Sequence, residues 1–460
     1  MCRRLLLIQP RAPPPAARLG LSVSVSPPPP LSSERNQPSR SLGASGEMLS
    51  SAMQSLELRE QDLTEMGSLI QSRVVLEVST QVQTLLDSLD SATLDIAVTG
   101  ESGAGKSTLV NALRGLSDSD PRAAPTGVVE TTAEPTPYPH PGLPSVRLWD
   151  LPGTGTPSFR AERYLEQVGL MHFDFFLLVA SERFRESHAQ LAQALASAGR
   201  RFYFIRTKVD QDLRASCRRR PGRCQEGQVL GEIRADCARQ LEKEGVAAPR
   251  VFLLSAFQLH RFDFPRLQAT LAEELAGHKR HALLLALPAL TAEAVGRRKE
   301  TLRRHVWKKA LLASLVSALP GLPLQLNVPM LVETLGSYRR SFGLDEESLG
   351  VLARAGAGSP QRLRAQVRSA LGRELSPAAV RDVLSQAALC GQVAARLART
   401  RLPLLENLVA GGISFVAAYF LLHSALEDFA GDAQRVLEAA YGTEEEGGPC
   451  DPPDPGFLFD

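Results

Sequence analysis

A glycine-rich segment between a predicted strand and a predicted helix limits the possible folds of this 460-residue chain more than any other feature. Residues 94–98 form a short apolar run typical of a buried strand, and residues 109–113 continue as a helix. The chain between them reads Gly100, Glu101, Ser102, Gly103, Ala104, Gly105, Lys106, Ser107 and Thr108. Such glycines let backbone N–H groups surround phosphate oxygens, and the helix start adds its partial positive charge. We therefore expect a phosphate-binding loop made by these residues, with Lys106 on the outer phosphates and Ser107 as a ligand of Mg²⁺.

A second motif ends the strand predicted at residues 146–149. Asp150 follows this strand and Gly153 comes three residues later. An aspartate in this place holds Mg²⁺ through water, and the glycine N–H reaches the γ-phosphate. Thr154 comes next, where many small GTPases have a glutamine that orients the attacking water, so we expect slow hydrolysis by a monomer.

Two later motifs predict the base that the site prefers. Thr207, Lys208 and Asp210 follow the strand at residues 202–205, at the sheet edge where ligands of open α/β folds bind. Asp210 accepts from N1–H and the exocyclic amine of guanine, and the Lys208 stem packs on the ring. Ser255 and Ala256 follow the strand at residues 251–254, where a backbone N–H reads guanine O6. Adenine lacks that amine, so the sequence predicts guanine nucleotide with Mg²⁺.

Composition excludes several other classes of protein. Hydrophobic residues make up 43% and charged residues 22%, as in soluble globular proteins. The 52 Lys and Arg nearly balance the 50 Asp and Glu, so no nucleic acid partner is implied. The cysteines form no CxxC pair, and we expect free thiols in a reducing, intracellular compartment. They are Cys2, Cys217, Cys224, Cys237, Cys390 and Cys450.

The order of the patterns predicts the domain organisation. Residues 1–47 are proline-rich and predicted to be disordered, residues 48–92 contain amphipathic helices, and residues 442–460 are an acidic, proline-rich tail. Strands alternate with helices over residues 93–282, and long helical segments fill residues 283–441. The predicted fold class is α/β: a P-loop domain with a mostly parallel sheet, beside an all-α helical domain.

Several continuous runs make the chain resemble the immunity-related, interferon-inducible GTPase family, and in particular its cinema-type branch. The runs are residues 126–132 (TGVVETT), 137–141 (PYPHP), 148–153 (LWDLPG), 175–179 (FFLLV), 206–210 (RTKVD), 341–345 (SFGLD) and 409–415 (VAGGISF). The resemblance covers about residues 50 to 440. It implies that residues 93–282 form a Ras-like G domain, which is inserted into an all-α helical domain built from chain segments on both sides of it.

The resemblance also implies partners and further site residues. Family members form a nucleotide-dependent homodimer or oligomer through the G face, and Glu101 falls where they place an acidic residue at that contact. Glu130 and Thr132 fall in the first switch, with Thr132 a further candidate for the Mg²⁺ site. We expect Lys106, Glu101, Glu130 and Thr132 to contribute to hydrolysis, completed by the partner subunit because Glu101 and Glu130 have no clear role within one chain. The family's habits predict a cytoplasmic protein, peripheral on the endoplasmic reticulum or other internal membranes, in cell-autonomous innate defence.

Two questions stay open at the level of sequence. Residues 407–426 carry no charge and suit either a buried bundle helix, which we favour, or a membrane span. A basic run at residues 297–309 is either a solvated helix face or a surface for anionic lipid headgroups.

For function, the main alternative to a GTPase is a GTP-binding scaffold that scarcely hydrolyses its nucleotide. A third possibility, an ATP-using enzyme, conflicts with Asp210.

Overall fold

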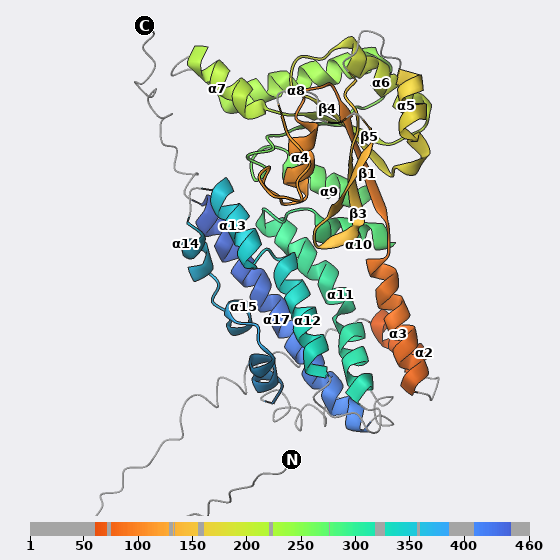
Figure 1. The fold of residues 1–460 in the computed structure, drawn as a ribbon, viewed down its shortest axis with the longest axis vertical. Coiled ribbons are helices and arrows are strands. Elements are labelled where there is room, and N and C mark those ends of the chain that lie inside the picture. The colour runs from red at the N-terminus through yellow and green to blue at the C-terminus, as the bar shows by residue number, and fades with distance from the viewer. Residues whose placement is uncertain are drawn as a thin grey trace, which may run out of the picture. The chain divides into compact units, whose positions relative to one another are not determined.

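The structure is a computed structural model that describes residues 60–70, 75–127, 132, 134–154, 161–219, 224–275, 277–317, 327–356, 359–385 and 409–442. The predicted leader at residues 1–47, the tail after residue 442 and Glu130 lie outside the described residues. Figure 1 shows a sheet flanked by helices and, from other parts of the chain, a group of long helices.

A six-stranded sheet forms the centre of the G domain. Its spatial order is β2-β3-β1-β4-β5-β6, and every neighbouring pair is parallel except β2 and β3. The strands are β1 (Leu94–Gly100), β2 (Thr136–His140), β3 (Leu143–Asp150), β4 (Phe175–Ala180), β5 (Phe202–Arg206) and β6 (Val251–Leu253). All residues of β1 and β4 are buried, as expected for central strands covered on both faces. The mostly parallel sheet predicted from the apolar runs is confirmed.

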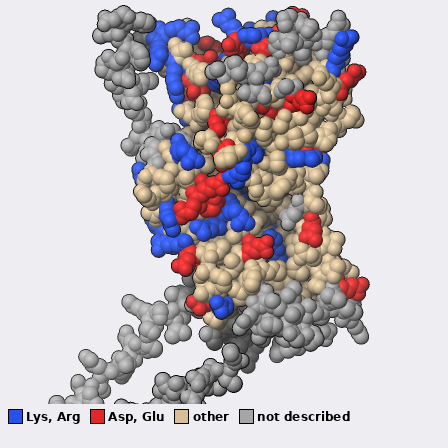
Figure 2. All heavy atoms as spheres, viewed as in Figure 1, with Lys and Arg blue, Asp and Glu red and all other residues tan. Residues whose placement is uncertain are grey.

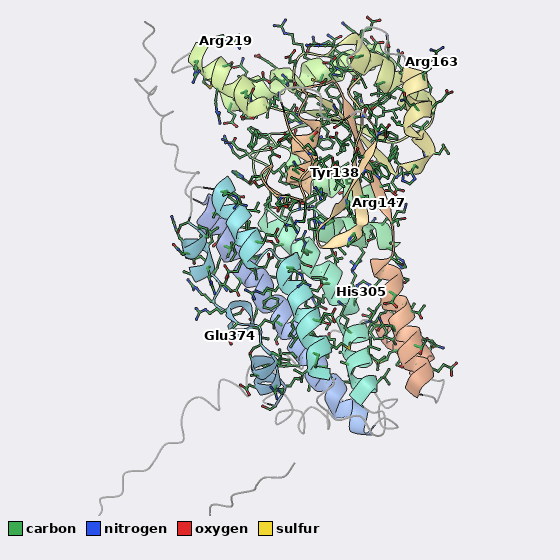
Figure 3. The ribbon with its side chains drawn as sticks, viewed as in Figure 1. Tyr138, Arg147, Arg163, Arg219, His305 and Glu374 are labelled. Atoms are coloured by element: carbon green, nitrogen blue, oxygen red, sulfur yellow. A yellow bond between two sulfur atoms is a disulfide. The ribbon has the colours of Figure 1, made fainter. Side chains whose placement is uncertain are left out.

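The edge strand β2 was not predicted, because its sequence contains two prolines and no apolar run. Proline is tolerated at a sheet edge, where one side of the strand needs no ladder hydrogen bond. Figure 3 labels Tyr138 on the edge strand β2 and Arg147 on its neighbour β3.

Helices cover both faces of the sheet and create two apolar cores. Ile96 and Val98 point into one core and Ala97 points into the other, as the two-residue period of a strand requires. The helices here are α4 (Lys106–Leu113), α5 (Ala161–Val168), α6 (Glu186–Ser197), α7 (Val209–Arg219), α8 (Glu226–Lys243), α9 (Phe264–Glu274) and α10 (Gly277–Ala286), with the 3₁₀ turn η1 (Leu170–His172). Helix α10 crosses residue 282, where the sequence predicts a domain boundary.

A third core joins helices from before and after the sheet. Met66 and Val82, which precede the sheet in sequence, share it with Trp307 and Phe429, which follow. Its helices are α2 (Glu60–Ile70), α3 (Val75–Asp90), α11 (Ala292–Ser317), α12 (Asn327–Ser341), α13 (Glu346–Ala355), α14 (Pro360–Ala365), α15 (Ala370–Arg373) and α17 (Val409–Tyr441). A G domain inserted between two parts of one helical domain is therefore confirmed.

The uncharged stretch at residues 407–426 belongs to the helical domain from residue 409 onward. Phe415, Leu422 and Leu426 of α17 are buried in the third core, as in an ordinary bundle helix. Among the described residues, no helix combines the length and the apolar character that crossing a bilayer requires.

The basic run at residues 297–309 does not form one free face. Lys299 pairs with Glu427 at 2.8 Å, and Lys308 pairs with Glu65 at 2.6 Å, while Arg298 is only 5% exposed. Side chains of both signs are interspersed on the face drawn in Figure 2, in keeping with a net charge of +2. The structure therefore gives no support to a purely electrostatic membrane surface along this helix.

One prediction about the cysteines is wrong. Cys217, in the last turns of α7, is disulfide-bonded to Cys224, which lies just before α8, whereas the sequence analysis expects free thiols. The Cα atoms lie 4.9 Å apart, inside the range that a disulfide needs. The chain returns to the end of α7 within seven residues, and spacing rules for CxxC pairs do not detect such a contact. Cys237 is free and buried.

Candidate nucleotide-binding site

The phosphate loop connects β1 to α4 through glycines whose positive φ angles favour glycine over other residues. Gly100 has φ 142°, and a side chain there would collide with the backbone of Val179 on β4. Gly105 has φ 86° and caps the N-terminus of α4. The loop therefore reverses tightly, and the free N–H groups at the start of α4 face the same space as the loop amides.

Lys106 lies within this loop rather than in solvent. It is 8% exposed, and its Nζ donates to the carbonyl oxygen of Glu101 at 3.2 Å. Ser102 and Gly103 are exposed at the tip, while Ser107 and Thr108 are half-buried on the first turn of α4. An ammonium group that lies beside a loop of backbone N–H groups suits the binding of a polyphosphate.

Three predicted metal-site residues meet at one carboxylate. Ser107 Oγ donates to Asp150 Oδ2 at 2.5 Å, and Thr132 Oγ1 donates to the same oxygen at 2.8 Å. These residues are 43 and 18 positions from Asp150 in sequence, so the fold itself brings them together. Asp150 is fully buried, and its Oδ1 has no hydrogen-bond partner among the described residues. The cluster thus brings together three side chains whose oxygen atoms can ligate a metal ion, and one oxygen of the Asp150 carboxylate accepts no hydrogen bond from the described residues.

The loop after β3 is fastened to the phosphate loop. Thr154 donates its N–H to Gly100 O at 3.1 Å, and the Tyr164 hydroxyl bonds both Thr99 Oγ1 at 2.7 Å and Pro152 O at 3.0 Å. Tyr164 therefore connects Pro152, the residue before Gly153, to Thr99 of β1. Thr154 is 1% exposed, and its hydroxyl has no partner among the described residues, so it points away from any solvent-filled part of the site.

The base motif is linked directly to the phosphate loop. Thr207 Oγ1 donates to Ala104 O at 2.7 Å, and Lys208 Nζ donates to Gly103 O at 2.9 Å. Lys208 adopts the uncommon φ of 58°, which lets it leave β5 and lie across the loop. Asp210, on the first turn of α7, is mostly buried and lies 3.9 Å from Arg214. The phosphate and base motifs thus form one continuous surface.

The loop after β6 lies beside the base motif. Val209 donates its N–H to Leu254 O at 3.4 Å, which ties the start of α7 to the end of this strand segment. Ser255 is 1% exposed, and Ala256 is half-buried. The Ser255 hydroxyl has no partner within the described part of the chain. The predicted O6 loop is therefore brought to the predicted base pocket.

Glu101 has partners that the sequence analysis did not find. Ser187 Oγ donates to its Oε1 at 2.7 Å, and Arg185 Nη1 lies 3.3 Å from its Oε2. His188 is 1% exposed and lies 3.8 Å from Oε1; burial lowers the pKa of this imidazole, so it is neutral at neutral pH. The sequence analysis gives Glu101 no clear role within one chain, whereas the N-terminal turn of α6 holds its carboxylate in the structure. Its role at a dimer contact stays a prediction.

The chain is similar in sequence to members of one known family. Residues 59–438 match the family described as Interferon-inducible GTPase. Interferon-inducible GTPase 5 of Bos taurus is 44% identical over 391 residues, which cover 85% of this chain and 84% of that protein. Its counterpart in Rattus norvegicus is 42% identical over 393 residues, covering 85% of both chains. Interferon-gamma-inducible GTPase 10 of Mus musculus is 39% identical over 318 residues, or 69% of this chain and 76% of that protein.

The chain belongs to the interferon-inducible GTPase family. The family predicted from seven short runs is confirmed, and with it the prediction of a GTPase that binds guanine nucleotide. The cinema-type branch is not tested by these matches and stays a prediction. In this interferon-inducible GTPase, one predicted nucleotide-binding motif follows each of β1, β3, β5 and β6. All four motifs therefore lie at the carboxyl edge of the sheet.

Proposed function

We propose that this interferon-inducible GTPase binds GTP with Mg²⁺ and hydrolyses it in a nucleotide-driven dimer. The observation that carries the proposal is the meeting of Ser107, Thr132 and Asp150 at one buried carboxylate beside the phosphate loop. A hydroxyl from the phosphate loop and a hydroxyl from the first switch share this acceptor. That arrangement links the loop that holds the phosphates to the segment that responds to them.

The donor set fits Mg²⁺ chemically. Magnesium prefers oxygen ligands and binds through one or two protein groups together with phosphate oxygens and water. Asp150 has an oxygen without a partner among the described residues, and the hydroxyls of Ser107 and Thr132 supply the remaining protein oxygens. When bound, the ion neutralises charge that develops on the phosphates.

The chain's own residues perform the binding steps. Lys106 leaves the Glu101 carbonyl to contact the outer phosphates, and the amides of the loop and of Gly153 bind phosphate oxygens. Asp210 accepts from the guanine edge while the Lys208 stem covers the ring. We infer that hydrolysis is slow within one chain, because Thr154 is buried and cannot orient a water.

We infer that a second copy of the chain completes the site across the G face. Glu101 is the acidic group at this face, and Ser187 and Arg185 hold it in the single chain. Release of Glu101 from these partners would make its carboxylate available to the facing subunit. Size-exclusion chromatography with light scattering tests this step, with a dimer expected in a non-hydrolysable GTP analogue and a monomer in GDP.

The buried Thr154 also favours a second candidate, a GTP-binding scaffold without meaningful turnover. Phosphate release measured over a hundredfold range of protein concentration separates the two. For the dimerising enzyme, turnover per molecule rises with concentration and Lys106→Ala abolishes it. Turnover that stays at background throughout supports the scaffold and refutes the enzyme.

We also propose a cytoplasmic protein that associates peripherally with internal membranes in innate defence, supported by family membership alone. Flotation with liposomes in GDP and in the GTP analogue tests it. Protein that stays at the bottom of the gradient in both nucleotides would contradict the membrane part of the proposal.

A further inference from the structure

The disulfide between Cys217 and Cys224 lies on α7, about two helical turns beyond Asp210 of the base motif. Both cysteines are half-buried, so part of each residue reaches solvent. The bond closes a ring across a sequence separation of seven. Closing so short a loop costs little chain entropy, so this bond adds less to the stability of the fold than a long-range disulfide does. The bond is therefore open to reagents and joins no distant parts of the chain.

Helix α7 is anchored by its first turns. Among its described residues only Val209 and Leu213 are buried, and Asp212 pairs with Arg206 at 2.6 Å. The described turns after Leu213 place no residue in a core, and the disulfide joins them to the start of α8. Opening the disulfide would thus release the last turns of α7, while the base motif at its start keeps anchors of its own.

The two sulfur atoms belong to opposite ends of two helices. Cys217 lies in the last turn of α7, where the negative end of a helix disfavours a thiolate. Cys224 directly precedes Gln225, the N-cap of the 18-residue helix α8, and the positive end of a helix favours a thiolate. Glu226, in the first turn of α8, is paired with Arg261 at 3.2 Å. Cys224 is therefore the better leaving group when the bond is attacked.

Arg218 places an available positive charge beside Cys217. Its side chain is exposed, and it forms no ion pair with another residue of the described chain. The next residue, Arg219, is labelled at the end of α7 in Figure 3 and donates from Nε to Ala215 O at 3.1 Å. An exposed guanidinium without a carboxylate partner suits the carboxylate of a small molecule.

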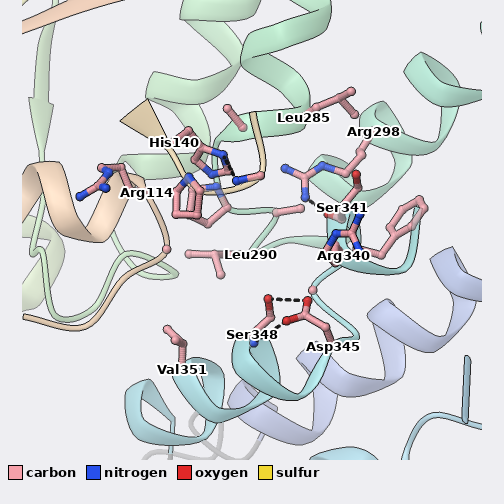
Figure 4. Close-up of a pocket in the computed structure, with 18 of the residues that line it drawn as sticks. Arg114, His140, Leu285, Leu290, Arg298, Arg340, Ser341, Asp345, Ser348 and Val351 are labelled. Atoms are coloured by element: carbon pink, nitrogen blue, oxygen red, sulfur yellow. Dashed lines mark hydrogen bonds between the residues drawn. The ribbon is translucent and has the colours of Figure 1, made fainter. Parts of the chain in front are cut away.

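Two charged groups at the interior cavity drawn in Figure 4 differ from Arg218, because the chain itself supplies their partners. Arg298 Nε donates to Leu284 O at 3.0 Å. Asp345 accepts from Ser348 Oγ at 2.8 Å. The charge of Arg218 is thus available on the surface beside the disulfide, whereas these two groups are engaged within the fold.

We propose that the Cys217–Cys224 bond undergoes reversible thiol–disulfide exchange with a small anionic thiol. The incoming thiolate attacks Cys217 Sγ and forms a mixed disulfide there, while the protein S–S bond breaks and its electron pair leaves on Cys224 Sγ. Arg218 pairs with a carboxylate of the incoming molecule. A second small thiolate attacks the sulfur of the first, and Cys217 leaves as a thiolate. Two small thiols are oxidised to one disulfide, and their two protons pass to the two cysteines.

The biological part of this inference rests on the cytoplasmic location proposed above. Disulfides in a reducing compartment are usually transient and redox-sensing rather than permanent. The chemistry itself does not depend on GTP, because neither cysteine belongs to the phosphate or base motifs. Its test therefore has a different readout from that of nucleotide binding.

Reduced glutathione, an anionic thiol, is the probe, added to the folded full-length protein with GDP and Mg²⁺. We expect it to open the bond without urea, and a short reaction to trap the mixed disulfide on Cys217, located by peptide mapping. Amide hydrogen exchange should then increase in α7 after Leu213, while GDP affinity stays unchanged. A bond that opens only after unfolding in urea, or a mixed disulfide on Cys224 alone, overturns the proposal. Absence of GDP binding would instead contradict the proposed function, because bond opening is measured separately.

Cys237 is an internal control for the folded state. It is 4% exposed, and burial raises the pKa of its thiol to about 11, so it stays protonated and unreactive in the folded protein. Glutathione should therefore leave Cys237 unmodified while it opens the disulfide. Modification of Cys237 at the same rate would show that unfolding, not exchange at the surface, exposes the bond, and this would also overturn the proposal.

The variant Arg218→Gln tests recognition of the anion. Loss of one exposed ion pair should slow opening by glutathione about threefold. Opening by cysteamine, whose thiolate form has no net charge, should not change. Arg239→Gln is the matched control, because it removes the same charge from an exposed position about 20 Å along α8. Equal effects of the two variants, or equal slowing with cysteamine, refute the assignment of Arg218.

Discussion

Replacing Asp150 by asparagine separates the contribution of this carboxylate to the stability of the fold from its contribution to binding of Mg²⁺ with nucleotide. The carboxylate accepts from Ser107 at 2.5 Å and from Thr132 at 2.8 Å, and each hydrogen bond to a charged group contributes about 1.5–3 kcal/mol. The asparagine oxygen can still accept these hydrogen bonds. The substitution also removes a fully buried charge, one of whose oxygens has no partner in the described structure. Removing the cost of burying that charge offsets several kcal/mol of the lost hydrogen-bond energy. Without Mg²⁺ we therefore expect the free energy of unfolding to change by no more than about 1 kcal/mol.

With Mg²⁺ and nucleotide the expected result is different. A ligand at 100 times its dissociation constant stabilises the folded protein by about 2.7 kcal/mol. Loss of a group that orients a bound metal weakens binding about 10- to 100-fold, and at the upper limit the stabilisation falls to about 0.4 kcal/mol. Urea unfolding followed by circular dichroism, with GDP and either EDTA or Mg²⁺, measures both quantities.

Asp95 provides a matched buried carboxylate at the other end of the same sheet. It accepts from Arg147 through two bonds of 2.7 Å and from Trp149 Nε1 at 2.7 Å. Asp95→Asn should lower the free energy of unfolding by about 3 kcal/mol in both solutions and leave the gain from Mg²⁺ intact. The reasoning is refuted if Asp150→Asn retains the full gain from Mg²⁺, or if the two variants behave alike.

Three further predictions address the base pocket, the G face and the buried histidines. Asp210→Asn should reduce the preference for guanine over xanthine nucleotides by about 100-fold in competition binding, and an unchanged preference would misplace the base pocket. Ser187→Ala removes a 2.7 Å hydrogen bond that holds Glu101, so dimerisation in the GTP analogue should require a lower protein concentration by light scattering; a weaker dimer would contradict the release step. Burial lowers the pKa of His281 to about 3 and of His305 to about 4, so the unfolded chain takes up protons that the folded chain does not. Stability should therefore fall from pH 6.5 towards pH 4, by up to about 1.4 kcal/mol per pH unit for each histidine, and a double replacement by asparagine should flatten this slope in urea unfolding.

Sequence predicts those parts of the site whose residues are consecutive in the chain. A strand, a glycine-rich loop and a helix are consecutive, so the loop at Gly100 and Gly105 needs no tertiary information. The meeting of Ser107 with Asp150 follows from one further rule, that parallel strands deliver their following residues to the same edge. The predicted sheet was correct in its central strands for the same reason.

The parts that sequence misses depend on which way a side chain faces. Ser187 lies 86 residues from Glu101, and nothing in a serine near a helix start signals that contact. Arg298 is counted in a basic run, although it faces inward while Lys299 faces Glu427. The spacing of residues 298, 302, 305 and 309 does contain that information, because it marks one helix face that mixes leucine with cations. Composition alone cannot separate such an inward stripe from a solvated one.

Calorimetric titration of the purified full-length chain with GDP and with a non-hydrolysable GTP analogue, each with Mg²⁺, tests the central claim most directly. The loops after β1, β3, β5 and β6 predict one site per chain for both nucleotides, with no competition from ADP because Asp210 reads the guanine amine. Folded protein that gives no heat with either guanine nucleotide, or that binds ADP equally well, would contradict the account.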